Sequence, residues 1–98
     1  MRVFWSTLAL ERVSEEAEHI ARDSAEAAEK WIDDIFASVE RLEMFPESGR
    51  IVPELNRRDV REVLHKRYRV IYKIKENRIE ILTVRHMRQL LDPDELEP

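Results

Sequence analysis

The chain has 98 residues, of which 39% are charged and 43% hydrophobic, and its formal net charge is −4. This length fits one domain and leaves little interior for a cofactor-binding cavity. The sequence contains no cysteine, which excludes disulfides, thiolate metal ligands and a thiol nucleophile. No apolar run resembles a signal peptide or approaches the ~20 residues of a membrane span, so we expect a cytoplasmic protein.

The charge is unevenly distributed along the chain. Residues 1–50 carry 6 Lys and Arg against 12 Asp and Glu, whereas residues 51–91 carry 11 against 5. The last seven residues add a charge of −4. A basic segment between acidic ones indicates a surface for an anionic partner, and it equally fits basic strands that neutralise acidic helices within the fold.

The first predicted elements are a strand and a helix. Residues 2–6 form a short strand with β-branched and aromatic residues at its centre. Ser6 or Thr7 then caps an amphipathic helix. The apolar stripe of this helix is predicted to comprise Leu10, Val13, Ala17, Ile20 and Ala21.

A second helix is predicted from its N-cap Ser24 to about Met44, where Pro46 and Gly49 end the helical pattern. Because about two residues separate the helices, they must fold back as an antiparallel hairpin. The apolar stripe of the second helix is predicted to comprise Ala28, Trp31, Ile32, Ile35, Val39 and Leu42.

Residues 45–59 are predicted as a loop, and three strands follow at 60–64, 69–75 and 78–85. Glu76-Asn77 is the expected hairpin tip, because Asn tolerates the positive φ of tight hairpins.

Both faces of these strands are partly apolar. Alternation places Val70, Tyr72 and Ile74 on one face and Arg69, Ile71 and Lys73 on the other. In the last strand Ile79 and Ile81 alternate with Glu80, Leu82 and Val84. One face must cover the helical hairpin, and we expect the other to lie open to a partner.

These elements coincide with a specific set of residues. The set comprises Trp5-Ser6, Ala9, Ile20-Ala21-Arg22-Asp23, Ala28, Trp31, Leu42, Phe45-Pro46, Gly49-Arg50, Arg61-Glu62, Tyr68-Arg69-Val70-Ile71-Tyr72, Ile81-Leu82, Val84 and His86. In this order and spacing the sequence resembles the RelE/ParE toxin superfamily from Val3 to Leu91. The resemblance implies an α+β fold with an N-terminal strand, an antiparallel helix hairpin and a three-stranded antiparallel sheet (β-α-α-β-β-β). Residues 1–91 then form the toxin domain, and residues 92–98 an acidic tail that is frayed after Pro93.

The resemblance also implies a partner, a cognate antitoxin that holds the toxin inactive. We expect the antitoxin to cover the second sheet face at Ile71, Lys73, Leu82 and Val84, as an added strand or a helix in a groove. No cofactor, membrane or small-molecule substrate is expected. The three histidines, His19, His65 and His86, lack ligand spacing, so no metal site is expected either.

Toxins of this superfamily act on one of two targets. Metal-free cleavage of ribosome-bound mRNA needs a proton acceptor, cations at the phosphate and a donor to the leaving oxygen. The candidates for a nuclease are His86, Arg61, Arg69, Arg85 and Arg88, with Lys73 and Tyr72 as further possibilities. Each has a structural alternative: a strand-end hydrogen bond for His86, salt bridges for Arg61 and Arg69, and a core position for Tyr72.

The end of the last strand favours the ParE branch of the superfamily, whose members inhibit DNA gyrase. Nuclease members often place Tyr directly after the His or add a Lys/Arg cluster with a Tyr, whereas here His86 is followed by Met87 and Arg88. The sequence pI near 5.4 also disfavours a ribosomal RNA binder. We therefore expect a gyrase inhibitor that contacts its target through Arg85, His86 and Arg88. The alternatives are a RelE-like mRNA endonuclease and a degenerate interaction module without toxicity.

Overall fold

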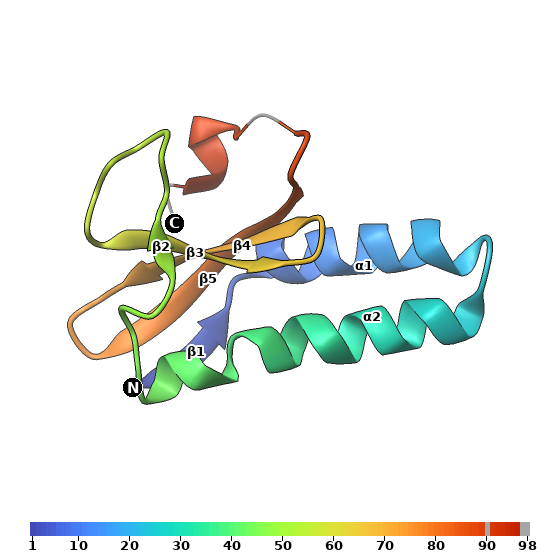
Figure 1. The fold of residues 1–98 in the computed structure, drawn as a ribbon, viewed down its shortest axis with the longest axis horizontal. Coiled ribbons are helices and arrows are strands. Elements are labelled where there is room, and N and C mark those ends of the chain that lie inside the picture. Colours follow the sequence, from blue (N-terminus) through green and yellow to red (C-terminus); the bar gives the residue numbers. More distant parts are fainter. Residues whose placement is uncertain (90, 97–98) are drawn as a thin grey trace.

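A computed structural model describes residues 1–89 and 91–96 of the chain. Two antiparallel helices lie along one side of a five-stranded sheet, and a loop and a short helical turn lie on the other (Figure 1). The class is α+β, as the sequence predicts. The elements in chain order are β1 (Arg2–Trp5), α1 (Thr7–Ala21), α2 (Ala25–Ser38), the 3-10 helix η1 (Glu40–Glu43), β2 (Arg50–Ile51), β3 (Val60–His65), β4 (Tyr68–Ile74), β5 (Arg78–His86) and the 3-10 helix η2 (Pro93–Leu96).

Helix α1 begins where the sequence predicts, because the Ser6 hydroxyl oxygen accepts the N–H of Ala9 at 3.0 Å. Its buried residues are Ala9, Val13 and Ala17. The expected stripe is wrong at Leu10, which is 45% exposed, and at Ala21, which is also exposed. The helix lies on β5 through its small residues at four-residue spacing, which lets the two backbones approach closely and turns Leu10 towards solvent.

Helix α2 is capped by Ser24, as predicted, and the Ser24 hydroxyl oxygen accepts the N–H of Ala27 at 3.1 Å. The helix ends at Ser38 rather than near Met44, and η1 continues the chain. The Ser38 hydroxyl donates to the carbonyl of Ile35 at 2.6 Å, a local bond that competes with α-helical continuation. The predicted stripe is confirmed: Ala28, Trp31, Ile35, Val39 and Leu42 are buried, and Ile32 is half-buried.

The sheet is larger than the expected three-stranded one. Its order is β1-β5-β4-β3-β2, with β1 parallel to β5 and the other pairs antiparallel. The three predicted strands are confirmed to within about two residues at each end. Strand β2 lies inside the segment predicted as a loop, and its two residues pair with Arg61 and Glu62 of β3. So short a strand carries no periodicity that a sequence pattern could reveal.

A β-bulge in β5 changes which side chains share a face. Ile71 pairs with Thr83 but its neighbour Tyr72 pairs with Ile81, so Leu82 is the extra residue. Before the bulge Ile81 packs on the helices, and after it Val84 does so too. The prediction that Val84 shares the face of Leu82 is therefore wrong.

The second face of the sheet is covered by the chain itself, so the expectation that it lies open is wrong. Ile71 and Leu82 are buried there beneath the segment before β3 and the segment that contains η2. The residues that complete this second core are Val52, Val60, Leu96, Leu55 and Leu91. The apolar residues on this face therefore belong to a second internal core.

The acidic C-terminal segment is ordered where the structure describes it. Instead of fraying after Pro93, residues 93–96 form η2, with Glu95 and Leu96 buried. After β5, residues 87 and 88 form a turn, which the N–H of Gln89 closes by donating to the carbonyl of His86 at 2.9 Å. Residue 90 and the last two residues of the expected tail, 97 and 98, lie outside the described residues.

The backbone angle φ is positive at residues other than Asn77, where it was expected. Glu76-Asn77 forms the tip between β4 and β5, as predicted, but Asn77 has no positive φ. The Lys75 N–H donates to the Arg78 carbonyl at 2.9 Å and closes the tip without it. Among the described residues, positive φ is found at Asn56 (51°) and at Lys66 (53°), in the turn between β3 and β4.

Within the described residues no helix is both long and apolar enough to span a membrane.

Candidate functional site

The end of the sheet opposite the β4–β5 tip carries the predicted residue His86. The last residue of β5, His86, pairs with the first residue of β4, Tyr68. Their rings meet edge to face with centroids 5.4 Å apart, and Tyr68 also contacts the ring of Trp31 at 5.0 Å. This aromatic stack joins α2 to the end of the sheet and fixes the position of the imidazole.

His86 borders a cleft of about 480 Å³ between α1 and the sheet. The wall formed by α1 carries both acidic and basic groups, and the opposite wall carries hydrogen-bonding rings and an amide. The lining residues are Glu15, Glu16, His19, Arg22, Tyr68, His86 and Gln89. The cleft is thus polar and open, which suits a contact with another macromolecule better than enclosure of a small ligand.

Tyr68 acts in this cleft as a hydrogen-bond donor. Its hydroxyl donates to the Glu16 carboxylate at 3.0 Å. Burial, together with the hydrogen bond to the Glu16 carboxylate, raises the pKa of Tyr68 to about 12. At neutral pH the phenol therefore keeps its proton.

The His86 ring is oriented by the turn that follows it. The backbone N–H of Arg88 donates to Nδ1 of His86 at 3.2 Å, and the backbone N–H of His86 donates to the Gln89 side-chain oxygen at 3.0 Å. Since Nδ1 accepts a hydrogen bond, the neutral ring carries its proton on Nε2. In this arrangement the ring donates from Nε2. The lone pair of Nδ1 already accepts the Arg88 N–H, which does not favour proton abstraction by this nitrogen.

The structure separates Arg85 from the other predicted contact residues. Arg88 is exposed beside His86. Arg85 is only 18% exposed and lies 3.3 Å from the carboxylate of Glu95, which also binds Arg12 of α1 at 2.5 Å. Arg85 thus helps to hold η2 against the sheet.

The remaining candidates for a nuclease support the fold elsewhere. Arg69 binds Glu62 at 2.5 Å and forms two 2.8 Å bonds to Glu54. Arg61 donates to the carbonyls of Glu47 and Gly49 and of Arg58. Tyr72 is fully buried in the first core. The structural alternatives stated for these residues are therefore the ones observed, except that Arg61 binds carbonyls and not a carboxylate.

Of the residues expected to bind an antitoxin, only Lys73 is partly exposed. Ile71, Leu82 and Val84 are each 2% exposed or less and offer no surface to a partner.

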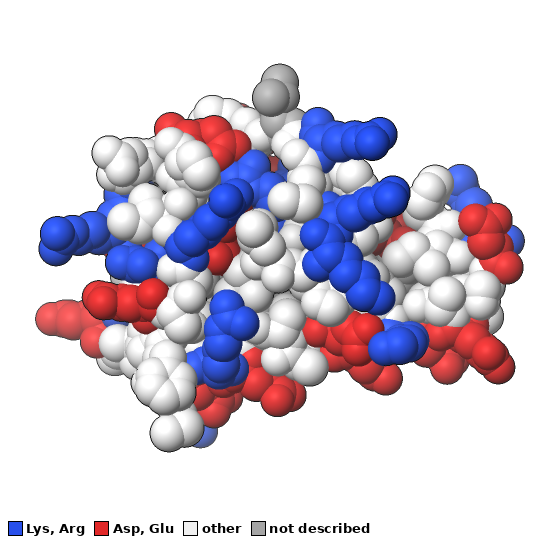
Figure 2. Space-filling view, in the orientation of Figure 1, with Lys and Arg blue, Asp and Glu red and all other residues white. Residues whose placement is uncertain are grey.

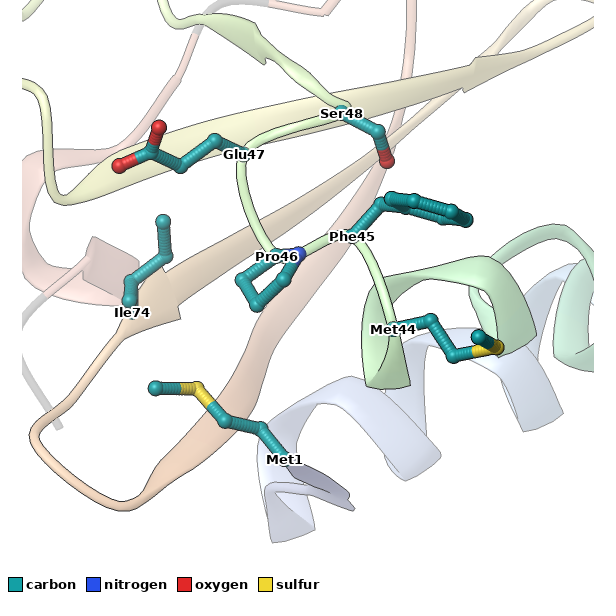
Figure 3. Close-up of a pocket in the computed structure, with 7 residues that line it drawn as sticks. All are labelled: Met1, Met44, Phe45, Pro46, Glu47, Ser48 and Ile74. Atoms are coloured by element: carbon teal, nitrogen blue, oxygen red, sulfur yellow. The ribbon is translucent and has the colours of Figure 1, made fainter.

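An apolar hollow at the opposite end of the sheet was not predicted. Met44 is 79% exposed and Phe45 61%, and together with Met1, Pro46 and Ile74 they border a hollow of about 630 Å³. Figure 3 shows the Met1 side chain reaching from the N-terminus towards Ile74 and Pro46, with Met44 and Phe45 extending from the segment after η1. Large apolar residues within a predicted loop were the available sequence signal.

The described residues contain no group of three or more histidine or carboxylate side chains that could hold a metal ion.

The family described as ParE toxin of type II toxin-antitoxin system, parDE, matches residues 3–91. The chain therefore belongs to the ParE family of type II toxins.

The fold agrees with this assignment. A solved structure titled "Chromosomal ParDE TA system from P. aeruginosa" is similar at a TM-score of 0.76 with 22% sequence identity, over 90% of this chain and 97% of that one. Among curated proteins, no sequence matches the chain significantly.

Proposed function

We propose that this ParE-family toxin arrests growth by inhibiting DNA gyrase in the cytoplasm, and that it contacts gyrase through His86 and Arg88. The observation that carries the proposal is the dispersal of the residues that RNA cleavage would need. Arg69 and Arg61 are engaged in structural bonds, and Arg85 faces Glu95. What remains at the cleft is an exposed binding surface.

We also propose that a cognate antitoxin binds this toxin. Family membership implies such a partner. The exposed apolar residues around the hollow of Figure 3 support a protein contact, since exposed apolar patches of this kind mark interaction sites.

Two readouts after induction in cells test the target. Filamentation with a DNA-damage response, together with loss of supercoiling by purified gyrase, is the expected result. Rapid loss of translation with cut mRNA would instead indicate the RelE-like endonuclease, and unaffected growth would indicate a degenerate interaction module.

The contact residues are tested by a His86→Ala/Arg88→Ala variant. We expect it to weaken gyrase inhibition by about tenfold or more, as for loss of a central interface contact. The matched control is Arg58→Ala, because Arg58 is exposed in the loop before β3, away from this end of the sheet. A folded double variant with full toxicity would refute the site.

A further inference from the structure

Three cationic side chains lie together at the end of the sheet that carries His86. Lys66 and Arg67 form the turn between β3 and β4, and Arg88 follows β5. The N–H of Met87 donates to the carbonyl of Arg67 at 2.7 Å, which ties the turn to the segment after β5. Figure 2 shows basic side chains gathered over the β3–β4 turn and the segment after β5, above acidic side chains on the helices. We call Lys66, Arg67 and Arg88 the cationic rim.

The rim is only weakly compensated, because the Asp34 carboxylate attracts Lys66 electrostatically but forms its ion pair with Lys30. All three side chains are exposed, and none makes an ion pair with any residue that the structure describes. The nearby carboxylates already have partners: Glu15 binds Arg12 at 3.1 Å, Glu16 accepts from Tyr68 at 3.0 Å, and Asp34 binds Lys30 at 2.9 Å.

The strand pairing fixes where the two cationic residues of the turn lie along the backbone. His65 and Tyr68 pair directly across it, so only Lys66 and Arg67 connect the two strands. Lys66 has a φ of 53°, a backbone conformation that costs a non-glycine residue free energy. Two cationic residues therefore follow one another at the tip of the β3–β4 hairpin, where both side chains are exposed.

We propose that the cationic rim binds an acidic segment of the toxin's protein target, beside the contacts of His86. This rests on the proposed function and adds Lys66 and Arg67 to it. Complementary charges across an interface steer association and fix its register.

A short acidic protein segment fits the rim better than a nucleic acid. Duplex DNA carries one charge per ~1.7 Å, so it would run from the rim onto neighbouring surfaces. Those surfaces include the helical hairpin, and residues 1–50 carry twice as many acidic as basic residues. The whole chain is also acidic, with a net charge of −4.

The test compares a charge-reversed rim with a matched reversal elsewhere. In the rim variant, Lys66→Glu/Arg67→Glu, the two charges of the turn are reversed. The control variant, Arg2→Glu/Arg58→Glu, reverses two exposed cations that make no ion pair with described residues. We expect the rim variant to lose roughly tenfold or more of its gyrase inhibition, and the control variant less than about twofold. Inhibition by the wild type should also weaken as salt rises, and less so in the rim variant.

Two labelled probes examine the rim without the target: an oligoglutamate peptide and a single-stranded oligonucleotide of equal charge. Fluorescence anisotropy at low salt should show tighter binding of the peptide, and the rim variant should lose it. In NMR spectra the peptide should shift the amides of Lys66, Arg67 and Arg88.

The outcomes separate the two proposals. A wild-type chain that does not inhibit gyrase refutes the proposed function, while loss of peptide binding in the rim variant still supports the rim. Equal peptide binding by the rim variant and the wild type, or tighter binding of the oligonucleotide, overturns the rim proposal. If the rim variant melts earlier than the control variant, Lys66→Gln/Arg67→Gln replaces it under the same criteria.

Discussion

The amide N–H of Gly49 donates to the hydroxyl oxygen of Tyr72 at 3.0 Å, and the same hydroxyl donates to the carbonyl of Pro46 at 2.6 Å. A Cβ at position 49 would lie 2.6 Å from that hydroxyl and 2.7 Å from the carbonyl oxygen of Glu62. The buried Tyr72 and the backbone of β3 therefore leave no room for a side chain at position 49, which only glycine can occupy without a shift. Its role is close approach, since it has no positive φ.

Replacing Gly49 with alanine should destabilise the fold. The new methyl group would overlap Tyr72 and the β3 backbone, which costs about 1–3 kcal/mol of unfolding free energy in a packed interior. Urea unfolding followed by circular dichroism measures the change. Glu47→Ala, at a nearby exposed position, should change stability by less than about 0.5 kcal/mol. Equal stabilities for the two variants would contradict the assigned role.

Among the described carboxylates, Glu62 should be the one whose substitution lowers stability most. It is 1% exposed, and Arg50 and Arg69 each lie 2.5 Å from it. Glu62→Gln replaces one carboxylate partner of the buried Arg69 with a neutral amide while the pair with Glu54 remains, and we expect a loss of about 1.5–3 kcal/mol. Arg50 is 52% exposed, so Arg50→Ala should cost only about 0–1 kcal/mol. The comparison uses urea unfolding at pH 7, and similar losses for both variants would be inconsistent with the buried network.

Acid should weaken the fold in part through Glu54. The Arg69 guanidinium holds the pKa of this carboxyl below its usual value of 4.5. A folded-state pKa below the unfolded one stabilises the fold fully above pH 4.5, and this contribution is lost as the pH falls through the folded-state pKa. Glu54→Gln should therefore lose less unfolding free energy than the wild type between pH 5 and pH 3, measured by urea unfolding at each pH. An unchanged pH dependence would show that the pair contributes nothing.

Both tyrosines should resist ionisation in the folded chain. Burial raises the pKa of Tyr68 to about 12 and also raises the pKa of Tyr72. Absorbance near 295 nm should show little phenolate at pH 10.0 in the folded chain, and half-ionisation there in urea. A folded-state pKa above the unfolded one stabilises the fold below pH 10 and is lost as the pH rises through the folded-state pKa, so stability should fall in alkali. Half-ionisation near pH 10 without urea would contradict the burial of these side chains.

The local features of the fold could be predicted from the sequence. Ser6 and Ser24 cap the helices as expected, and the α2 stripe is buried as predicted, because capping and helical periodicity are properties of neighbouring residues. Of the predicted contact residues, His86 and Arg88 lie together because a single residue separates them in the chain, and the Arg88 N–H donates to Nδ1 of His86.

The remaining parts of the site depended on contacts between distant segments. The bulge at Leu82 moved Val84 to the helical side, and η2 engaged Arg85 through Glu95. A strict alternation of faces cannot anticipate an inserted residue, since the bulge reverses the phase of the pattern within one strand.

The sequence by itself determined the helical hairpin, the three later strands, the resemblance to the superfamily and the basic character of residues 51–91. The tertiary structure alone decided that the second apolar face is an internal core. It alone also decided that Lys66, Arg67 and Arg88, which form no ion pair among the described residues, lie at the same end of the sheet. Periodicity shows that a face is apolar, but what covers that face depends on residues tens of positions away in the chain. Here Leu96 lies against Ile71 and Leu82, and a partner was not needed to bury them.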